Sequence, residues 1–262
     1  MFDKLKNSEL RLSEIINMAF SVFKEQFKNF FGIALIIGMP INLVMILVLS
    51  QFKLANITVN LQDIVKDADA ATAFLESSQF SQLMLYYGIW EFLRGLLYPL
   101  MLLATAHLTM EAIEGRVPDY KKSALAAFEK GPVLVAASVV YMLVVYGGMC
   151  LFLIPGVIFI VWLYFYSYAI ILDNETAMGA LKKSFFLTKN RFGKTAVKLL
   201  PLLLLKYALN NIASRVFMSG YNLSMTFVSE CVGNVIDIFI WCAITLLYVN
   251  IRDYKYYGQQ DI

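Results

Sequence analysis

The chain has 262 residues, of which 60% are hydrophobic, 15% aromatic and 16% charged, and its net charge is +3. Soluble domains are about half apolar and about a quarter charged, so this composition excludes an ordinary soluble domain and indicates an integral membrane protein. The charges form no tract typical of a nucleic-acid partner. The three cysteines, Cys150, Cys231 and Cys242, lack the spacing of a metal or redox site.

The first predicted element is an amphipathic helix over residues 9–28. Its apolar residues recur at helical spacing on one face, whereas the charged residues lie elsewhere. A helix of this kind lies in the membrane interface. A first membrane-spanning helix is expected over residues 30–49, with Pro40 as a tolerated kink.

The longest connection is expected over residues 51–79, where acidic side chains outnumber basic ones. We expect this connection to be an outside loop, on the side of the membrane opposite the termini. The second spanning helix is predicted over residues 83–110. It is longer than a straight crossing needs, which implies a tilt or an extension beyond the membrane.

A short basic connection follows, with a second interfacial helix predicted over residues 119–130. The third and fourth spans are expected over residues 133–152 and 156–172. Only residues 153–156, Leu-Ile-Pro-Gly, separate them, so these two spans should form a tight antiparallel hairpin.

A third interfacial helix is predicted over residues 176–192, after a polar cluster suited to capping a helix. Its apolar residues recur on one face, and four basic residues lie on the other side: Lys182, Lys183, Lys189 and Arg191. We expect this basic face to contact membrane lipids, in particular anionic headgroups. The last two spans are expected over residues 196–218 and 227–249, with a short polar tail from Asn250.

The distribution of Lys and Arg predicts the orientation. They concentrate in the N-terminal segment, in the second and fourth connections and in the tail, whereas the opposite side has only Lys53, Lys66 and Arg215. By the positive-inside rule both termini are cytoplasmic, which an even number of spans requires.

Two stretches resemble each other closely enough to predict an internal repeat. Residues 28–32 followed by Pro40 match residues 189–193 followed by Pro201, and a weaker copy surrounds Ala127-Phe128. The predicted unit is one interfacial helix plus one transmembrane hairpin, present three times.

Ionisable and amide side chains inside the spans are costly unless they are paired or hydrated, so they are the candidate functional residues. They are Glu91, Arg94, Lys206, Asn210, Arg215, Glu230, Asn234 and Asp237. In an antiparallel hairpin, Lys206 lies at the depth of Asp237, Asn210 at that of Asn234, and Arg215 at that of Glu230.

Glu91 and Arg94 pair with each other or complete a network. Two interpretations of the whole cluster stay open. The pairs hold the bundle together, or they line a polar cavity that admits a headgroup, an ion or a proton.

Several motifs together resemble a known family: the amphipathic start, the Ile-Pro-Gly break at residues 154–156, the basic segment ALKKSFFLTKNRF at 180–192, and LLYVNIR at 246–252. They are similar to the bacterial family of the glycerophosphoryl diester phosphodiesterase membrane domain, which includes the YciC-type inner-membrane proteins. The resemblance implies six helices and a role in membrane or envelope integrity. It implies no catalysis, because the phosphodiesterase activity of that name belongs to a separate domain. The family pattern has an acidic residue where Asn250 stands.

We therefore expect an all-α bundle of six spans with three cytoplasmic interfacial helices in the bacterial inner membrane. The expected function is non-enzymatic support of envelope integrity, through organisation of lipids or of a membrane-protein partner. The alternatives are a transporter or channel-like module that uses the polar cluster, and an immunity protein against a membrane-active peptide. The sequence predicts no catalytic residue, cofactor or metal site.

Overall fold

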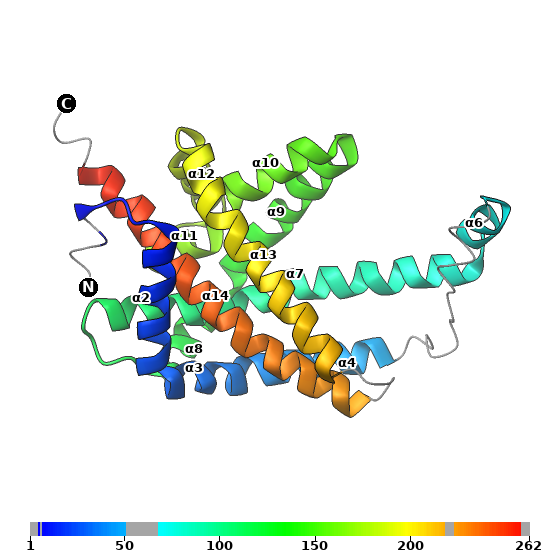
Figure 1. Cartoon of the computed structure of the whole chain (residues 1–262), viewed down its shortest axis with the longest axis horizontal. Coiled ribbons are helices and arrows are strands. Elements are labelled where there is room, and N and C mark those ends of the chain that lie inside the picture. The colour runs from blue at the N-terminus through cyan, green and yellow to red at the C-terminus, as the bar shows by residue number, and fades with distance from the viewer. Residues whose placement is uncertain (1–4, 6, 51–67, 218–222, 258–262) are drawn as a thin grey trace.

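The computed structural model describes residues 5, 7–50, 68–217 and 223–257, and these residues form a bundle of helices without a β-strand (Figure 1). Within the described residues, six helical segments are long and apolar enough to cross a membrane: Phe27–Val48, Ser78–Ile113, Gly131–Cys150, Pro155–Leu172, Phe192–Phe217 and Ser224–Tyr254. The predicted all-α bundle of six spans is confirmed. The chain is a multi-pass membrane protein.

Three short amphipathic helices lie at one end of the bundle: α2 (Leu12–Glu25), α8 (Tyr120–Glu129) and α12 (Ala177–Lys189). Polar side chains fix where two of them begin. The Asp119 carboxylate accepts a hydrogen bond from the Lys121 backbone N–H at 2.9 Å, and the Thr176 hydroxyl accepts one from the Gly179 N–H at 3.2 Å. We call this end the interfacial end.

The first span is not a uniform α-helix. It begins as α3 (Phe27–Ile33), widens into the π-helix η1 (Ala34–Gly38) and continues as α4 (Met39–Ser50). Pro40 has no N–H, and in a regular helix its ring would collide with the carbonyl group one turn earlier. The wider π-helical turn directly before Pro40 relieves this collision, so the expected kink takes the form of η1.

Residues 51–67 of the expected outer loop lie outside the described residues. The rest of that loop forms α6 (Ala68–Leu75) and the start of α7 (Ser78–Ile113), where the Ser77 hydroxyl accepts a hydrogen bond from the Phe80 N–H at 3.2 Å. The second span is thus longer at both ends than predicted, in agreement with the expected extension.

The tight hairpin of the third and fourth spans is confirmed, because Phe152 alone separates α9 (Gly131–Leu151) from α10 (Leu153–Leu163). Gly156 permits this approach. A Cβ atom at this position would lie 2.3 Å from the Met149 side chain and 3.1 Å from its backbone.

The predicted fourth span is present as Pro155–Leu172, but its helix is interrupted. The helix ends at Leu163 and restarts as α11 (Tyr166–Leu172). Side chains of α12 replace the hydrogen bonds lost at the break. The Ser184 hydroxyl accepts from the Phe165 N–H at 3.1 Å and donates to the Trp162 carbonyl at 2.8 Å, and Thr188 donates to the same carbonyl at 3.2 Å. A broken helix is tolerated at membrane depth where neighbouring side chains satisfy its backbone in this way.

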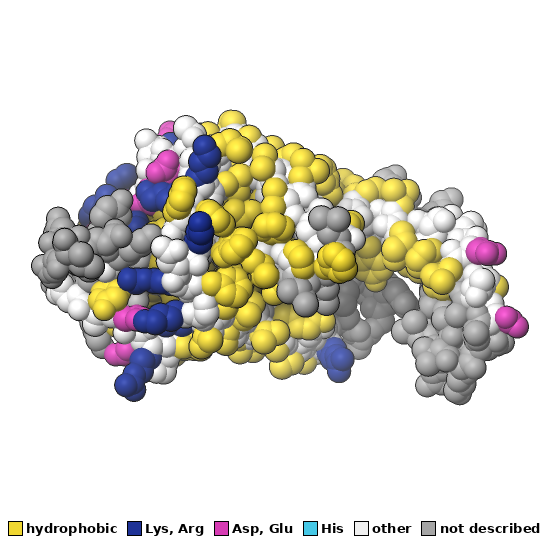
Figure 2. Space-filling model, turned by 90° about the horizontal axis from the view of Figure 1, so that it is seen from above, with side chains coloured by type: hydrophobic (Ala, Val, Ile, Leu, Met, Phe, Trp, Pro, Cys, Tyr) yellow, Lys and Arg dark blue, Asp and Glu magenta, His cyan; other side chains and the backbone are white. Residues whose placement is uncertain are grey.

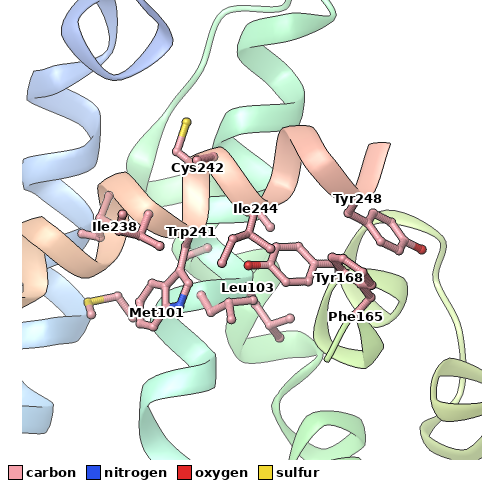
Figure 3. Packing of buried hydrophobic residues seen from close by; sticks show 14 of the residues in the cluster. Met101, Leu103, Phe165, Tyr168, Ile238, Trp241, Cys242, Ile244 and Tyr248 are labelled. Atoms are coloured by element: carbon pink, nitrogen blue, oxygen red, sulfur yellow. The ribbon is translucent and has the colours of Figure 1, made fainter. Parts of the chain in front are cut away.

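The last hairpin consists of α13 (Phe192–Phe217) and α14 (Leu223–Tyr257). Every residue of α14 from Ile240 to Ile251 is buried, so α14 is the central helix, with α2, α7 and α13 packed around it. Figure 3 shows this core, in which the rings of Tyr168 and Tyr248 stack with centroids 5.8 Å apart.

The expected polar tail from Asn250 is helical as far as Tyr257, and Asn250 itself is buried. The Asn250 amide donates to the carbonyls of Leu5 at 2.7 Å and Ser8 at 2.8 Å, and its oxygen accepts from the Leu10 N–H at 3.2 Å. These contacts bind the N-terminal segment to α14. An aspartate could make the third contact but not the other two, since an ionised carboxylate has no donor.

The order of one amphipathic helix followed by one hairpin recurs three times in the described chain, as the repeat predicted. Each amphipathic helix buries an alanine completely: Ala19, Ala127 and Ala180. The two glycines that the repeat aligns, Gly32 and Gly193, have different surroundings, however. A Cβ at Gly32 would meet the Tyr120 ring at 2.6 Å, whereas one at Gly193 would meet nothing within 4 Å.

The surface agrees with a membrane-spanning orientation. Figure 2 shows hydrophobic side chains over the middle of the molecule and most of the visible Lys and Arg side chains at the interfacial end. Large apolar side chains of the spans, including Leu143 and Val197, are 70% exposed. A continuous apolar belt of this kind is the surface that lipid covers.

Candidate functional site

The polar side chains inside the bundle centre on an ion pair between α13 and α14. Lys206 Nζ lies 3.0 Å from Asp237 Oδ2, and the Asn210 amide donates to Asp237 Oδ1 at 2.8 Å. The Lys206 ammonium also lies 4.6 Å from the centre of the Trp241 ring, a favourable cation–π position. The predicted pairing of Lys206 with Asp237 is confirmed.

The other two predicted pairings are wrong. Asn210 binds Asp237 instead of Asn234, and Asn234 lies against Gly38 of η1, where a Cβ would come within 2.4 Å of its amide nitrogen. At 100° per residue, Asn234 is turned about 60° from Asp237 around the helix, which directs it towards the first span and away from α13.

Arg215 is exposed on α13 and forms no ion pair with Glu230 in the described structure. It lies about half a turn round α13 from the face that carries Lys206, as the helical spacing implied. Glu230 instead accepts a hydrogen bond from the Tyr98 hydroxyl at 3.1 Å.

Tyr98 is the site residue that the sequence analysis missed. Its hydroxyl lies 2.9 Å from Asn42 Oδ1 as well as near Glu230, and its ring lies under the Arg94 guanidinium, with 5.0 Å between Cζ and the ring centre. Tyr98 thus joins α4, α7 and α14. The available signal was its position four residues after Arg94, on the same face of α7.

Two adjoining cavities surround these groups, one of about 340 Å³ and one of about 400 Å³. Glu91, Arg94 and Lys206 line both cavities. The first is otherwise lined largely by apolar and aromatic side chains, including Tyr164 and Trp241, and the second by polar ones, including Asn211 and Ser229. Their volumes are in the range of small-molecule sites.

The second candidate site is the basic side of α12. Lys182 and Lys189 are exposed, but the four predicted residues do not form one lipid-facing surface. Lys183 is turned inward and pairs with Asp173 and Glu175, each at 3.1 Å. Burial alone would lower the pKa of Lys183, but its hydrogen bonds and charge attraction to these two carboxylates raise it above the usual value.

Arg191 is only half-buried and stacks on the Tyr254 ring, 5.5 Å from its centre. The prediction was wrong for Lys183 because its ammonium is paired with Asp173 and Glu175, 100° round the helix from the outward-facing Lys182. Asp173, placed at the junction of α11 and α12, also accepts hydrogen bonds from Arg252 at 2.6 Å and from the Tyr248 hydroxyl. Lys183 therefore belongs to a structural network.

The described residues contain no group of three or more His, Cys, Asp or Glu side chains that could hold a metal ion. Of the three cysteines, Cys242 is buried and Cys231 half-buried, whereas Cys150 is exposed. No family model, curated protein or solved structure matches this chain.

Proposed function

We propose that the chain is a non-enzymatic protein of the bacterial inner membrane that supports envelope integrity by organising anionic lipids at the cytoplasmic surface. Its α2, α8 and α12 would contact the lipids, and both termini would be cytoplasmic. The concentration of Lys and Arg at the interfacial end supports this orientation. The resemblance to the YciC-type inner-membrane proteins supports the location.

The observation that carries the proposal is the outer face of α12. Met178, Lys182, Phe186 and Lys189 follow one another at helical spacing on the same side, and all four are exposed, with Met178 54% and Phe186 60% exposed. Apolar side chains on such a helix enter the acyl region of the membrane, and each lysine near an anionic surface contributes about 1 kcal/mol.

The other two amphipathic helices have the same kind of outer face. Exposed Lys121, Leu125 and Phe128 lie together on α8, and exposed Phe20 and Lys24 lie one turn apart on α2. Because the buried faces hold the three helices on the bundle, their outer faces are presented together to one membrane surface.

The test is the double substitution Lys182→Gln and Lys189→Gln, which spares the structural Lys183. The variant should retain less phosphatidylglycerol than the wild type on purification in mild detergent, and it should fail to restore the envelope of a deletion strain. Arg215→Gln, an exposed arginine on a span, is the matched control and should behave as the wild type. Full restoration by the double variant would refute the proposal. Loss of restoration with unchanged lipid enrichment would indicate a protein partner instead.

A second candidate function is a transporter or channel-like module, which the cavities beside the Lys206–Asp237 pair favour. Under this alternative, Asp237→Asn should abolish function in a folded protein, whereas the lysine variant of α12 should remain active.

A further inference from the structure

We propose that the two adjoining cavities lined by Glu91, Arg94 and Lys206 bind the headgroup of a zwitterionic, amine-bearing phospholipid. Arg94 would bind the phosphate, Glu91 would bind the ammonium group, and one acyl chain would lie in an apolar groove between α7 and α9. This site is separate from the surface lysines, so it does not depend on the proposed function.

Two charged side chains beside these cavities form no ion pair within the described residues. Glu91 and Arg94 lie well inside α7, and they line the same two cavities as Lys206 from the middle of α13. In the described structure no carboxylate lies within 4 Å of Arg94, and no cation lies within 4 Å of Glu91. Lys206 and Asp237, by contrast, neutralise each other at 3.0 Å.

Glu91 and Arg94 form no direct ion pair with each other, although they are one turn apart. Arg94 is half-buried and directed to the Tyr98 ring, whereas Glu91 is exposed on the bundle surface. An ionised group at membrane depth needs a partner or water. Two charges of opposite sign that lack a direct ion pair and lie beside one cavity match a ligand that carries both a phosphate and an ammonium group, and a guanidinium is well suited to the phosphate.

An apolar groove of about 720 Å³ adjoins this pair of charges. Glu91 is its only charged residue, and the remaining lining comes from side chains of α7 and α9 such as Met84, Phe92 and Leu143. The groove follows α7 from Met84 to Phe92, a length of about 12 Å at the helical rise. A hydrocarbon chain fits this surface, and the charges at its end fit the headgroup of the same molecule.

Glycine keeps the groove open. A Cβ atom at Gly88 or Gly147, which both line it, would meet nothing within 4 Å. A larger side chain can therefore be added at Gly147 without collision with the protein. Gly147→Leu fills the groove and leaves the polar cavities unchanged, which separates binding of the chain from binding of the headgroup.

The experiment is native mass spectrometry of the purified full chain with equal amounts of phosphatidylethanolamine and phosphatidylglycerol. The wild type should retain phosphatidylethanolamine preferentially. Arg94→Gln should weaken its retention about tenfold, as expected for the loss of a charge-assisted hydrogen bond. Glu91→Gln should remove the preference between the two lipids, and Gly147→Leu should weaken both.

The controls are Arg215→Gln, outside the three cavities, and the Lys182→Gln, Lys189→Gln double variant. Both should keep the preference for phosphatidylethanolamine, so failure of this proposal is distinguishable from failure of the surface-lipid proposal. Equal retention of the two lipids by the wild type would overturn the inference. Lipid retention that Arg94→Gln does not change would also overturn it. So would displacement of the lipid by inorganic phosphate to the same extent in Gly147→Leu as in the wild type. Thermal unfolding of each variant identifies any loss that comes from misfolding, and Gly147→Leu, placed in open space, provides a test that does not depend on the charged variants.

Discussion

Neutralisation of Lys206 should destabilise the protein more than neutralisation of Asp237. The Asp237 side chain is 1% exposed, whereas that of Lys206 is 22% exposed beside the cavities. In Lys206→Met, the Asp237 carboxylate stays buried with Asn210 as its partner and cannot reach water. In Asp237→Leu, the lysine keeps its position near the Trp241 ring and can extend its flexible chain into the cavity.

The expected magnitudes follow from the cost of an uncompensated charge. Breaking a buried ion pair costs about 3–5 kcal/mol, and a single charge at the centre of a span costs about 3 kcal/mol on insertion scales. We expect a loss of about 3 kcal/mol for Lys206→Met and about 2 kcal/mol for Asp237→Leu. A protein of this size shifts its Tm by about 2–4 °C for each kcal/mol, so Lys206→Met should lower the Tm by about 6–12 °C.

The assay is thermal unfolding in detergent of the two single variants and the double variant. The double variant should recover about 2 kcal/mol relative to the sum of the single losses, because it leaves no charge behind. Recovery should be incomplete, since the Asn210 amide then loses its Asp237 acceptor and keeps only the Lys206 carbonyl. Arg215→Met is the matched control and should change the Tm little. Additive losses would refute the reasoning, because they would mean that the two side chains do not interact.

Three further predictions concern helix contacts near the ends and centre of the bundle. Gly38→Ala should lower the free energy of unfolding by about 1–3 kcal/mol in the same assay, because its new methyl group collides with α14. The control Gly147→Ala, in open space, should be neutral or stabilising. Equal effects of the two substitutions would contradict the packing. Asn250→Asp should speed hydrogen exchange in the segment from residue 7 to Leu12, because it loses both donors to that segment; unchanged protection would contradict this role. Hydrogen bonds from Lys194 and then Lys198 lower the pKa of Glu9, so the stability that these contacts provide is present above about pH 4.5 and is lost as the pH falls through the lowered value. The Tm values of the wild type and of Glu9→Gln should therefore converge at acidic pH and in high salt. A difference in Tm that stays constant would refute this role of Glu9.

Much of the architecture follows from local sequence patterns. Apolar runs of bilayer length mark the six spans, and helical periodicity with capping residues marks α8 and α12, because the sequence of one helix reports which of its faces is buried. The pairing of Lys206 with Asp237 was also predictable. A hairpin brings residues of equal depth together, and charges of opposite sign at membrane depth attract each other strongly.

Only the tertiary structure decided which neighbour each remaining polar group meets. The break between α10 and α11 depends on Ser184, whose position on α12 is remote from the backbone that it satisfies. The inward direction of Lys183 depends on Asp173, and the burial of Asn250 depends on the N-terminal segment that crosses α14. The periodicity of one helix shows which of its faces is buried, but not which residue of another helix that face contacts. The angle and order in which the helices pack determine that partner, so they also determine that Glu91 and Arg94 face the same cavities without an ion pair in the described structure.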